Sequence, residues 1–160
     1  MSEDLEIRPA LPSDLALILS LIREIAEFEN LAHEVIATEE GMSEYLFGER
    51  PVAEVLIAEI GGDPVGFALF YQNFSTFVGR PGIHLEDIFV REQARGRGVG
   101  KALLIEVARI AYERQCGRLE WNVLDWNSSA IAFYGSLGAK VHSEWKMTRM
   151  DAKAIANLVK

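Results

Sequence analysis

The stretch that decides the fold reads Glu92-Gln93-Ala94-Arg95-Gly96-Arg97-Gly98-Val99-Gly100-Lys101. It lies between a β run, residues 83–90, and a segment with helical periodicity, residues 99–115. Glycine permits positive φ and close approach of a ligand, and the first amides of a helix have no intrahelical partners. Because the helix dipole also favours negative charge there, the pattern predicts a loop that binds a diphosphate. Three basic side chains are expected to add charge-assisted contacts: Arg95, Arg97 and Lys101.

Spacing excludes two other glycine-rich loops. The dinucleotide fingerprint is G-x-G-x-x-G, whereas Gly96, Gly98 and Gly100 alternate strictly. A nucleoside-triphosphate loop needs Ser or Thr after its Gly-Lys, and here Ala102 follows Lys101. The remaining alternative is a solvent-exposed turn with incidental arginines. The strand before the loop, the helix after it and the interleaved arginines favour anion binding.

Composition limits the class of protein. The 160 residues are 49% hydrophobic with a formal net charge of −8, and we expect one domain over residues 1–160. The acidic start, Met1-Ser2-Glu3-Asp4, and the absence of a long apolar run predict no signal peptide, no membrane contact and a cytoplasmic location. An excess of 24 acidic over 16 basic residues argues against nucleic-acid binding. It suits a cationic substrate, although charge that merely keeps the protein dispersed is the alternative explanation.

Periodicity and turn signals predict the order of elements. Strands are expected at residues 7–10, 55–60, 65–72, 83–90, 118–124 and 141–150. Helices are expected at residues 15–26, 38–46, 99–115 and 128–137. Pro9 places the first strand at a sheet edge, and residues 73–82 are expected to form a loop. Early hairpins followed by a β–loop–α–β–α–β order imply a mixed α/β sheet with helices on both faces.

Several motifs resemble one family. Arg95 to Gly100 resembles the R/Q-x-x-G-x-G/A signature of the GCN5-related N-acetyltransferase (GNAT) superfamily, whose loop holds the pyrophosphate of acetyl-CoA. Leu85 to Val90 resembles the strand that pairs with the pantetheine arm, and Asp125 to Tyr134 resembles the later cofactor segment with its general-acid tyrosine. Residues 7–10 and 21–29 resemble the diamine (spermidine/spermine) and thialysine branch of that family.

The resemblance implies a GNAT fold, with a mostly antiparallel sheet, one parallel pairing near the cofactor, and acetyl-CoA as co-substrate. Cofactor contacts are implied for Ile88, Phe89, Val90, Arg95, Gly96, Arg97, Gly98, Val99, Gly100, Lys101, Asn127, Ala130 and Tyr134. For Asn127, a helix cap is the alternative and is compatible with a cofactor contact. The resemblance also implies a homodimer, with the tail of one subunit near the other's site. No metal is expected, because His33, His84 and His142 share no metal-ligand spacing.

Acetyl transfer to an amine requires a proton acceptor for the amine and a proton donor for the departing thiolate. Tyr134 matches the general acid, since a phenol with a pKa of about 10 can donate to a thiolate; core packing is the alternative. Glu86 and Asp87 are adjacent on a strand and point to opposite faces unless a bulge intervenes, and Glu86 is the favoured acceptor. The substrate-binding residues implied by the resemblance are Phe28, Glu29, Glu34, Glu86, Asp87 and Glu144.

The sequence therefore predicts an acetyl-CoA-dependent N-acetyltransferase. Its acceptor is expected to be a primary amine of a small cationic substrate (a diamine, polyamine or thialysine-like molecule), attacked directly in a ternary complex. Two alternatives remain: a protein or peptide lysine acetyltransferase, which needs an open groove, and a non-catalytic acyl-CoA-binding regulatory module, against which Tyr134 argues. Cys116 is expected to be a structural or incidental thiol, because reactive cysteines need an activating, electropositive setting.

Overall fold

The computed structural model describes residues 4–160. Residues Met1–Glu3 lie outside this described range. They belong to the acidic start from which the sequence analysis predicts no signal peptide. The chain divides into two compact units, Met1–Asn122 and Val123–Lys160, and each is described by itself. One domain over the whole chain stays a prediction. None of the helices in residues 4–160 combines the length and the apolar character that spanning a membrane requires.

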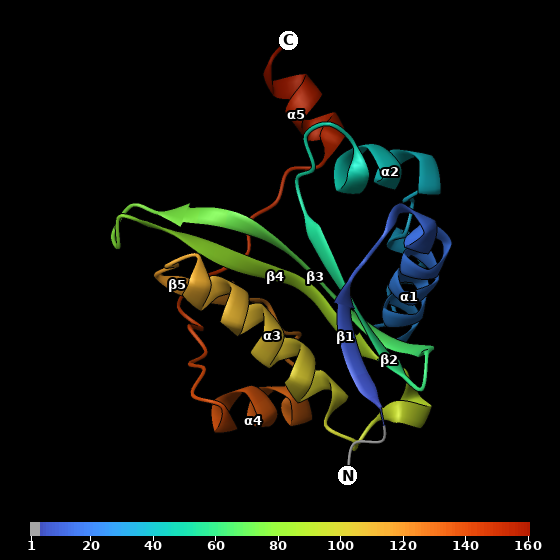
Figure 1. Cartoon of the computed structure of the whole chain (residues 1–160). Coiled ribbons are helices and arrows are strands. Elements are labelled where there is room, and N and C mark those ends of the chain that lie inside the picture. The colour runs from blue at the N-terminus through green and yellow to red at the C-terminus, as the bar shows by residue number, and fades with distance from the viewer. Residues whose placement is uncertain (1–3) are drawn as a thin grey trace. The chain divides into compact units, whose positions relative to one another are not determined.

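A mixed sheet forms the centre of the first unit (Figure 1). Among the described residues it has five strands in the spatial order β1-β2-β3-β4-β5: β1 (Leu5–Pro9), β2 (Glu54–Ile60), β3 (Asp63–Ser75), β4 (Arg80–Val90) and β5 (Arg118–Trp121). Neighbours from β1 to β4 pair antiparallel, whereas β4 and β5 pair parallel. This confirms the predicted sheet with one parallel pairing. The strand that contains Pro9 lies at the edge of the sheet. Proline has no amide hydrogen to donate, and an edge strand tolerates this because one of its sides has no partner strand.

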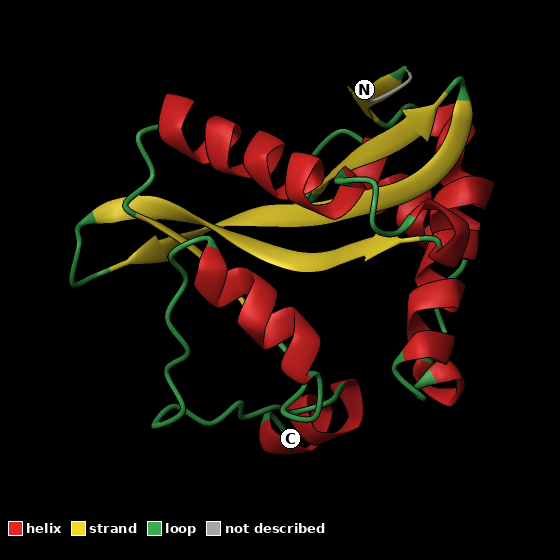
Figure 2. Cartoon of the chain, turned by 90° about the horizontal axis from the view of Figure 1, so that it is seen from below, coloured by secondary structure: helices red, strands yellow, loops and turns green. Residues whose placement is uncertain are grey.

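Two long helices cover opposite faces of this sheet (Figure 2). From α1 (Leu15–Phe28), Ile18 and Leu21 join a core cluster with Val55, Ile57, Phe67 and Phe89. Alternation along β3 turns Gly66 to the other face, where a Cβ would lie 3.5 Å from Leu103 Cδ1 of α3 (Val99–Glu113). The sheet is therefore buried between α1 on one side and α3 on the other.

Shorter elements connect these layers. The helix α2 (Glu39–Phe47) packs against α1 and begins at Thr38, whose hydroxyl oxygen accepts a hydrogen bond from the Gly41 amide at 3.1 Å. The described part of the chain also contains 3-10 turns, namely η1 (Pro12–Asp14), η2 (Ala32–Glu34) and η3 (Glu92–Ala94). The Arg8 guanidinium donates to Asp14 at 2.8 and 3.0 Å and to Glu59 at 2.7 and 3.0 Å, and it thereby ties β1 to η1 and β2.

The connection between β3 and β4 is shorter than the sequence predicts. Residues 73–82 were expected to be loop, but strand pairing continues to Ser75 opposite Arg80, and only residues 76–79 turn. Pro81 is tolerated because β5 begins to pair with β4 only at Gly82, so one edge of β4 has no strand partner at Pro81. The expectation of a long loop was wrong because pairing across a sheet outweighs local turn signals.

The second unit contains α4 (Ser128–Ser136), as expected, and α5 (Ala152–Leu158), which was not predicted. The strand expected at residues 141–150 is wrong, because the described residues of this segment pair with no other strand. An extended segment becomes a strand only when another strand supplies hydrogen-bond partners, which a local pattern cannot specify. The signal for α5 was available: Asp151 accepts a hydrogen bond from the Ala154 amide at 2.8 Å as an N-cap.

Candidate functional site

The glycine loop joins β4 to α3 within the first unit. Gly96 and Gly98 adopt positive φ, 74° and 82°, and Gly98 is the N-cap of α3. The first helical bond runs from the Ala102 amide to the Gly98 carbonyl (3.0 Å), so the amides of residues 99–101 precede the helical ladder. A Cβ at Gly96 or Gly98 would meet no described atom within 4 Å. The loop therefore needs glycine for its dihedral angles and leaves open space beside these amides.

The three basic residues of the loop differ in their surroundings. Arg97 and Lys101 are exposed. Arg95 Nε donates to the Val90 carbonyl at 2.9 Å, and its guanidinium carbon lies 4.9 Å from the centre of the Phe28 ring and 5.6 Å from that of Phe89. Arg95 thus joins the loop to the end of β4 and to α1, and its contact with phosphate stays a prediction. Arg95 is itself exposed, so all three cations are accessible to solvent.

The final part of β4 has a free edge. Within the described residues, β5 pairs with β4 only from Gly82 to Leu85, although β4 continues to Val90. Residues 86–90 therefore present backbone amides and carbonyls on the side away from β3 without a neighbouring strand. Ile88, Phe89 and Val90, the residues expected to pair with the cofactor arm, lie in this part of the strand. Sequence reasoning located the strand but could not show where its pairing with β5 stops.

A β-bulge at Glu86 changes which face of the sheet Asp87 occupies. In the register of β3 with β4, Phe70 pairs with Leu85 and Leu69 pairs with Asp87, so Glu86 is the additional residue. Residues that pair directly share a face, so Asp87 lies with Leu69 on the face that α1 covers. Without the bulge Asp87 would point to the opposite face. The sequence analysis named a bulge as the exception to strict alternation, and the strand register contains one at Glu86.

Three carboxylates influence one another at this bulge. Burial, followed by the charges of Glu86 and Glu29, raises the pKa of Asp87 from 3.8 to about 6. Burial also raises the pKa of Glu29, which follows the last residue of α1. The group therefore combines a half-buried carboxyl, poised near neutrality, with two further acids that attract a cation. Glu86 is the most exposed, with 54% of its side chain accessible.

Two residues that sequence reasoning left without a role lie beside this group. His84 pairs with Tyr71 across the sheet, and their ring centres are 5.0 Å apart. His84 Nε2 is 3.4 Å from Glu86 Oε2. Burial, followed by the charge of Glu86, raises the pKa of Tyr71. Nothing in the spacing of the sequence singled out His84; the strand register alone places it here.

The other two predicted substrate residues of the first unit, Phe28 and Glu34, do not belong to this group of carboxylates. The Phe28 ring lies under the Arg95 guanidinium. Glu34 is in η2 with 71% of its side chain exposed, pairs with His33 at 3.4 Å, and is not among the charges that raise the pKa of Asp87. The structure thus brings Glu29, Glu86 and Asp87 together and leaves Glu34 apart from them. Across residues 4–160, no group of three or more His, Cys, Asp or Glu side chains is arranged to hold a metal.

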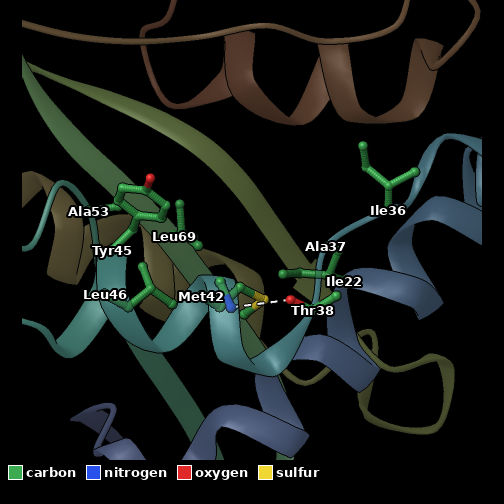
Figure 3. A pocket seen from close by; sticks show the side chains of 10 residues that line it. Ile22, Ile36, Ala37, Thr38, Met42, Tyr45, Leu46, Ala53 and Leu69 are labelled. Atoms are coloured by element: carbon green, nitrogen blue, oxygen red, sulfur yellow. Dashed lines mark hydrogen bonds between the residues drawn. The ribbon is translucent and has the colours of Figure 1, made fainter. Parts of the chain in front are cut away.

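An apolar pocket of about 440 Å³ lies between α1, α2 and the sheet (Figure 3). Its lining residues are Ile22, Ile36, Ala37, Thr38, Gly41, Met42, Tyr45, Leu46, Ala53 and Leu69. Leu69, on its sheet side, is the strand partner of Asp87. None of Glu29, Glu86 and Asp87 is among its lining residues. Sequence reasoning missed the pocket because its walls come from segments up to 47 residues apart.

The second unit holds the remaining predicted residues. Asn127 caps α4 by accepting a hydrogen bond from the Ala130 amide at 3.3 Å, which confirms the cap. Tyr134 lies on α4 with its ring centre 5.6 Å from that of Phe133. Glu144 Oε1 is 3.3 Å from His142 Nδ1, and its backbone amide together with His142 lowers the pKa of that carboxyl. The cofactor and substrate contacts expected for Asn127, Ala130, Tyr134 and Glu144 stay predictions.

Comparison with known proteins gives consistent matches. A family model described as the acetyltransferase (GNAT) family matches residues 20–139. The chain is 40% identical to thialysine N-epsilon-acetyltransferase of Bos taurus over 95% of each protein. It is 34% identical to L-ornithine N5-acetyltransferase NATA1 of Arabidopsis thaliana over 93% of this chain and 85% of that protein. Among solved structures, an integron cassette protein from the mobile metagenome of V. cholerae is similar, with 27% identity, a TM-score of 0.80 and coverage of 100% of this chain and 99% of the other.

Proposed function

This chain belongs to the GNAT family of acetyltransferases and is an N-acetyltransferase, and we propose that it transfers the acetyl group of acetyl-CoA to a primary amine of a small cationic molecule. Diamines, polyamines and thialysine-like amines are the proposed class. The observation that carries the proposal is the order of groups along β4. Carboxylates lie at the bulge, a free backbone edge follows, and the glycine loop comes next. One strand thus supplies an acceptor site and a donor site side by side.

The residues of the loop fit the pyrophosphate of acetyl-CoA. The amides of residues 99–101 precede the helical ladder of α3, and the positive end of the helix dipole favours an anion beside them. The open space around Gly96 and Gly98 lets phosphate oxygens approach the backbone, and Arg97 and Lys101 supply compensating charge. The free edge of residues 86–90 offers hydrogen-bond partners to the amide groups of the pantetheine arm. When bound, acetyl-CoA supplies an activated thioester carbonyl.

The carboxylates of the first unit fit the amine. An alkylammonium must lose a proton before its nitrogen can attack, and a base of pKa near neutrality is suited to take it. The sequence favoured Glu86 as the acceptor; the structure gives the stronger case for Asp87, whose pKa burial raises to about 6. We assign proton acceptance to Asp87, and attraction of the cation to Glu86 and Glu29. The amine nitrogen then bonds to the carbonyl carbon, the carbon–sulfur bond breaks, and the thiolate takes the phenolic proton of Tyr134, the role that the resemblance implies for it. The proton that the nitrogen loses as the amide forms passes to solvent, from which Tyr134 is reprotonated.

The role of Tyr134 is tested by replacing it with phenylalanine, which removes only the hydroxyl. Loss of a general acid lowers kcat by roughly 10²-fold or more, whereas the dissociation constant of CoA changes by less than about twofold. Tyr112→Phe is the matched control, since Tyr112 lies on α3 with 85% of its surface exposed. Full turnover in Tyr134→Phe would remove Tyr134 from the mechanism.

The reaction class is tested by following release of the CoA thiol with a panel of amines. The panel contains thialysine, ornithine, 1,4-diaminobutane, spermidine and a lysine peptide. Reaction with the small cations and intersecting double-reciprocal lines support direct attack in a ternary complex; parallel lines would indicate a covalent acetyl-enzyme. Preference for the peptide would make the protein a lysine acetyltransferase of proteins. No thiol release with any amine, despite CoA binding, would make it a binding module.

We also propose that the protein acts in the cytoplasm as a homodimer, on the strength of the resemblance to the diamine and thialysine branch. Gel filtration with light scattering measures the mass directly. A mass near 17.9 kDa, that of one chain, would contradict the dimer. Fractionation of cells that express the tagged chain tests the location.

A further inference from the structure

We propose that His84 is a specificity-determining residue of the acceptor site: its imidazole lies against Glu86 and, when protonated, competes with the ammonium group of the acceptor for that carboxylate. The cationic acceptor is therefore held most tightly when the imidazole is neutral. This inference rests on the proposed binding of a cationic amine at Glu86, Glu29 and Asp87. It adds the group that sets how strongly these carboxylates attract the amine.

The bulge at Glu86 brings His84 and Asp87 onto one face of the sheet. His84 pairs with Tyr71 on β3. Asp87 pairs with Leu69, two residues earlier on the same strand. Because alternate residues of a strand point to the same side, Tyr71 and Leu69 share a face, and their partners on β4 share it with them. In a regular strand, two residues that are three positions apart would point to opposite faces. The imidazole thus lies on the same face as the buried carboxyl of Asp87.

The contacts of His84 connect it to Glu86. His84 Nε2 lies 3.4 Å from Glu86 Oε2, within the distance of an ion pair. The imidazole is the more enclosed partner, with 17% of its side chain exposed against 54% for Glu86. The Tyr71 ring packs against it with the two ring centres 5.0 Å apart. A half-buried imidazole thus contacts both an aromatic ring and a carboxylate that is open to solvent.

Neighbouring elements supply the other charges around His84. The titratable or charged groups that the strands place on this face near His84 are Tyr71 on β3, Arg80 and Asp87 on β4, and Arg118 and Glu120 on β5, with Glu86 at the bulge and Glu29 after the end of α1. Glu120 pairs directly with His84, whereas Arg118 lies two residues, or about 7 Å, further along β5. Imidazole is the side chain whose charge ordinarily changes between about pH 5 and pH 8. Of these described groups, His84 is therefore the one that adds a positive charge beside Glu86 as the pH falls.

The direction of the effect follows from these charges. A protonated His84 offsets the negative charge of Glu86, so an ammonium group that enters the site gains less from that carboxylate. Because Glu86 is half exposed, solvent screens the pair, and the expected change in the dissociation constant of the acceptor is about twofold to fivefold. The coupling is reciprocal, so binding of the acceptor lowers the proton affinity of His84 by the same factor. Protonation of Asp87 also weakens binding of a cation at low pH, and this contribution does not depend on His84.

Titration calorimetry measures the effect on binding. The full-length protein is saturated with CoA, which carries no acetyl group to transfer, and 1,4-diaminobutane is the probe at pH 5.5 and at pH 8.5. His84→Phe keeps a ring against Tyr71 and removes the charge, whereas His84→Gln removes both. In each variant, the ratio of the dissociation constant at pH 5.5 to that at pH 8.5 is expected to be about two to five times smaller than in the wild type. His33→Gln is the matched control: His33 lies the same 3.4 Å from Glu34, apart from Asp87, and this variant is expected to keep the wild-type ratio.

Nuclear magnetic resonance gives a second measurement that needs no substitution in the site. The ring proton signals of the histidines are followed against pH in the CoA complex of the wild type, with and without 1,4-diaminobutane. A twofold to fivefold coupling corresponds to a fall of about 0.3–0.7 pH unit in the titration midpoint of His84 when the probe is added. The midpoint of His33 is expected to stay where it is.

The outcomes separate this inference from the proposed function. An unmoved His84 midpoint, a wild-type ratio in both His84→Phe and His84→Gln, or an equal change in His33→Gln overturns the role of His84 while acetylation of amines stands. If the variants at His84 lose the fold, the midpoint measured in the wild type decides. Absence of thiol release with every amine of the panel, together with no binding of 1,4-diaminobutane at either pH, would instead reject the proposed function.

Discussion

Replacing Asp87 with asparagine is expected to stabilise the fold at neutral pH while it removes activity. The amide resembles the protonated carboxyl in shape and carries no charge. The pKa of Asp87 is raised from 3.8 to about 6 by burial, by Glu86 and by Glu29, so ionisation is less favourable in the folded protein than in the unfolded chain. At 1.36 kcal/mol per pH unit, this difference corresponds to about 3 kcal/mol.

The sign of the pH dependence follows from proton binding. Between about pH 4 and pH 6 the folded protein holds the Asp87 proton more tightly than the unfolded chain does, so the free energy of unfolding falls as pH rises. The Asp87→Asn variant has no carboxyl to ionise at this position, so its free energy of unfolding does not fall with pH for this reason. The variant and the wild type are therefore expected to be nearly equally stable at about pH 4, and the variant to be more stable by up to about 3 kcal/mol at about pH 8.

Urea denaturation at a series of pH values measures this difference directly. Asp14→Asn is the control of opposite sign, because hydrogen bonds from the Arg8 guanidinium lower the pKa of Asp14. That variant is expected to be less stable than the wild type at neutral pH, with the deficit shrinking as pH falls. An Asp87→Asn protein no more stable than the wild type at pH 8 would refute the electrostatic reasoning. A full rate of acetyl transfer in that variant would refute the assignment of Asp87 as proton acceptor.

Four further substitutions test the loop, the core and the ion pair between Arg91 and Glu24. Gly98→Ala forces a side chain into φ 82° and is expected to lose about 1–2 kcal/mol in urea denaturation and to weaken CoA binding in titration calorimetry. Gly100→Ala, whose Cβ would lie 3.6 Å from the nearest atom without positive φ, is expected to keep stability; an equal loss in both would contradict the strain argument. Phe67→Ala empties a fully buried position and is expected to lose about 3–5 kcal/mol, and a loss under 1 kcal/mol would contradict its place in the core. Arg91→Ala breaks two hydrogen bonds to Glu24 (2.9 and 3.0 Å) and is expected to lose about 1–3 kcal/mol by the same measurement; an unchanged urea midpoint would contradict it.

Much of the local structure was readable from the residues themselves. Glycines at alternate positions before an apolar helical repeat predicted the loop at the start of α3, and Pro9 predicted an edge strand. The helix cap at Asn127 was predictable because its side chain accepts a hydrogen bond from the amide of Ala130, which is three residues later in the sequence. These predictions hold because the interactions that decide them join residues close in sequence.

Other features depended on pairing between distant segments. The bulge at Glu86 became certain only from the register of β3 with β4, and it moved Asp87 onto the face of α1, beside Leu69 and near Glu29. The same register brought Tyr71 to His84, and folding placed Arg95 against the rings of Phe28 and Phe89. The strand expected at residues 141–150 failed for a related reason, since no pattern along one segment states whether a partner strand is available.

The amino-acid order alone thus determined the class of fold and the glycine loop between a strand and a helix, and it singled out a set of acidic residues. Tertiary structure decided which carboxyl is buried, which aromatic rings lie against the Arg95 guanidinium, and that an apolar pocket forms between α1, α2 and the sheet. The physical reason is that backbone dihedral preferences and capping act over a few residues, whereas burial and pKa shifts depend on atoms that folding brings from elsewhere in the chain.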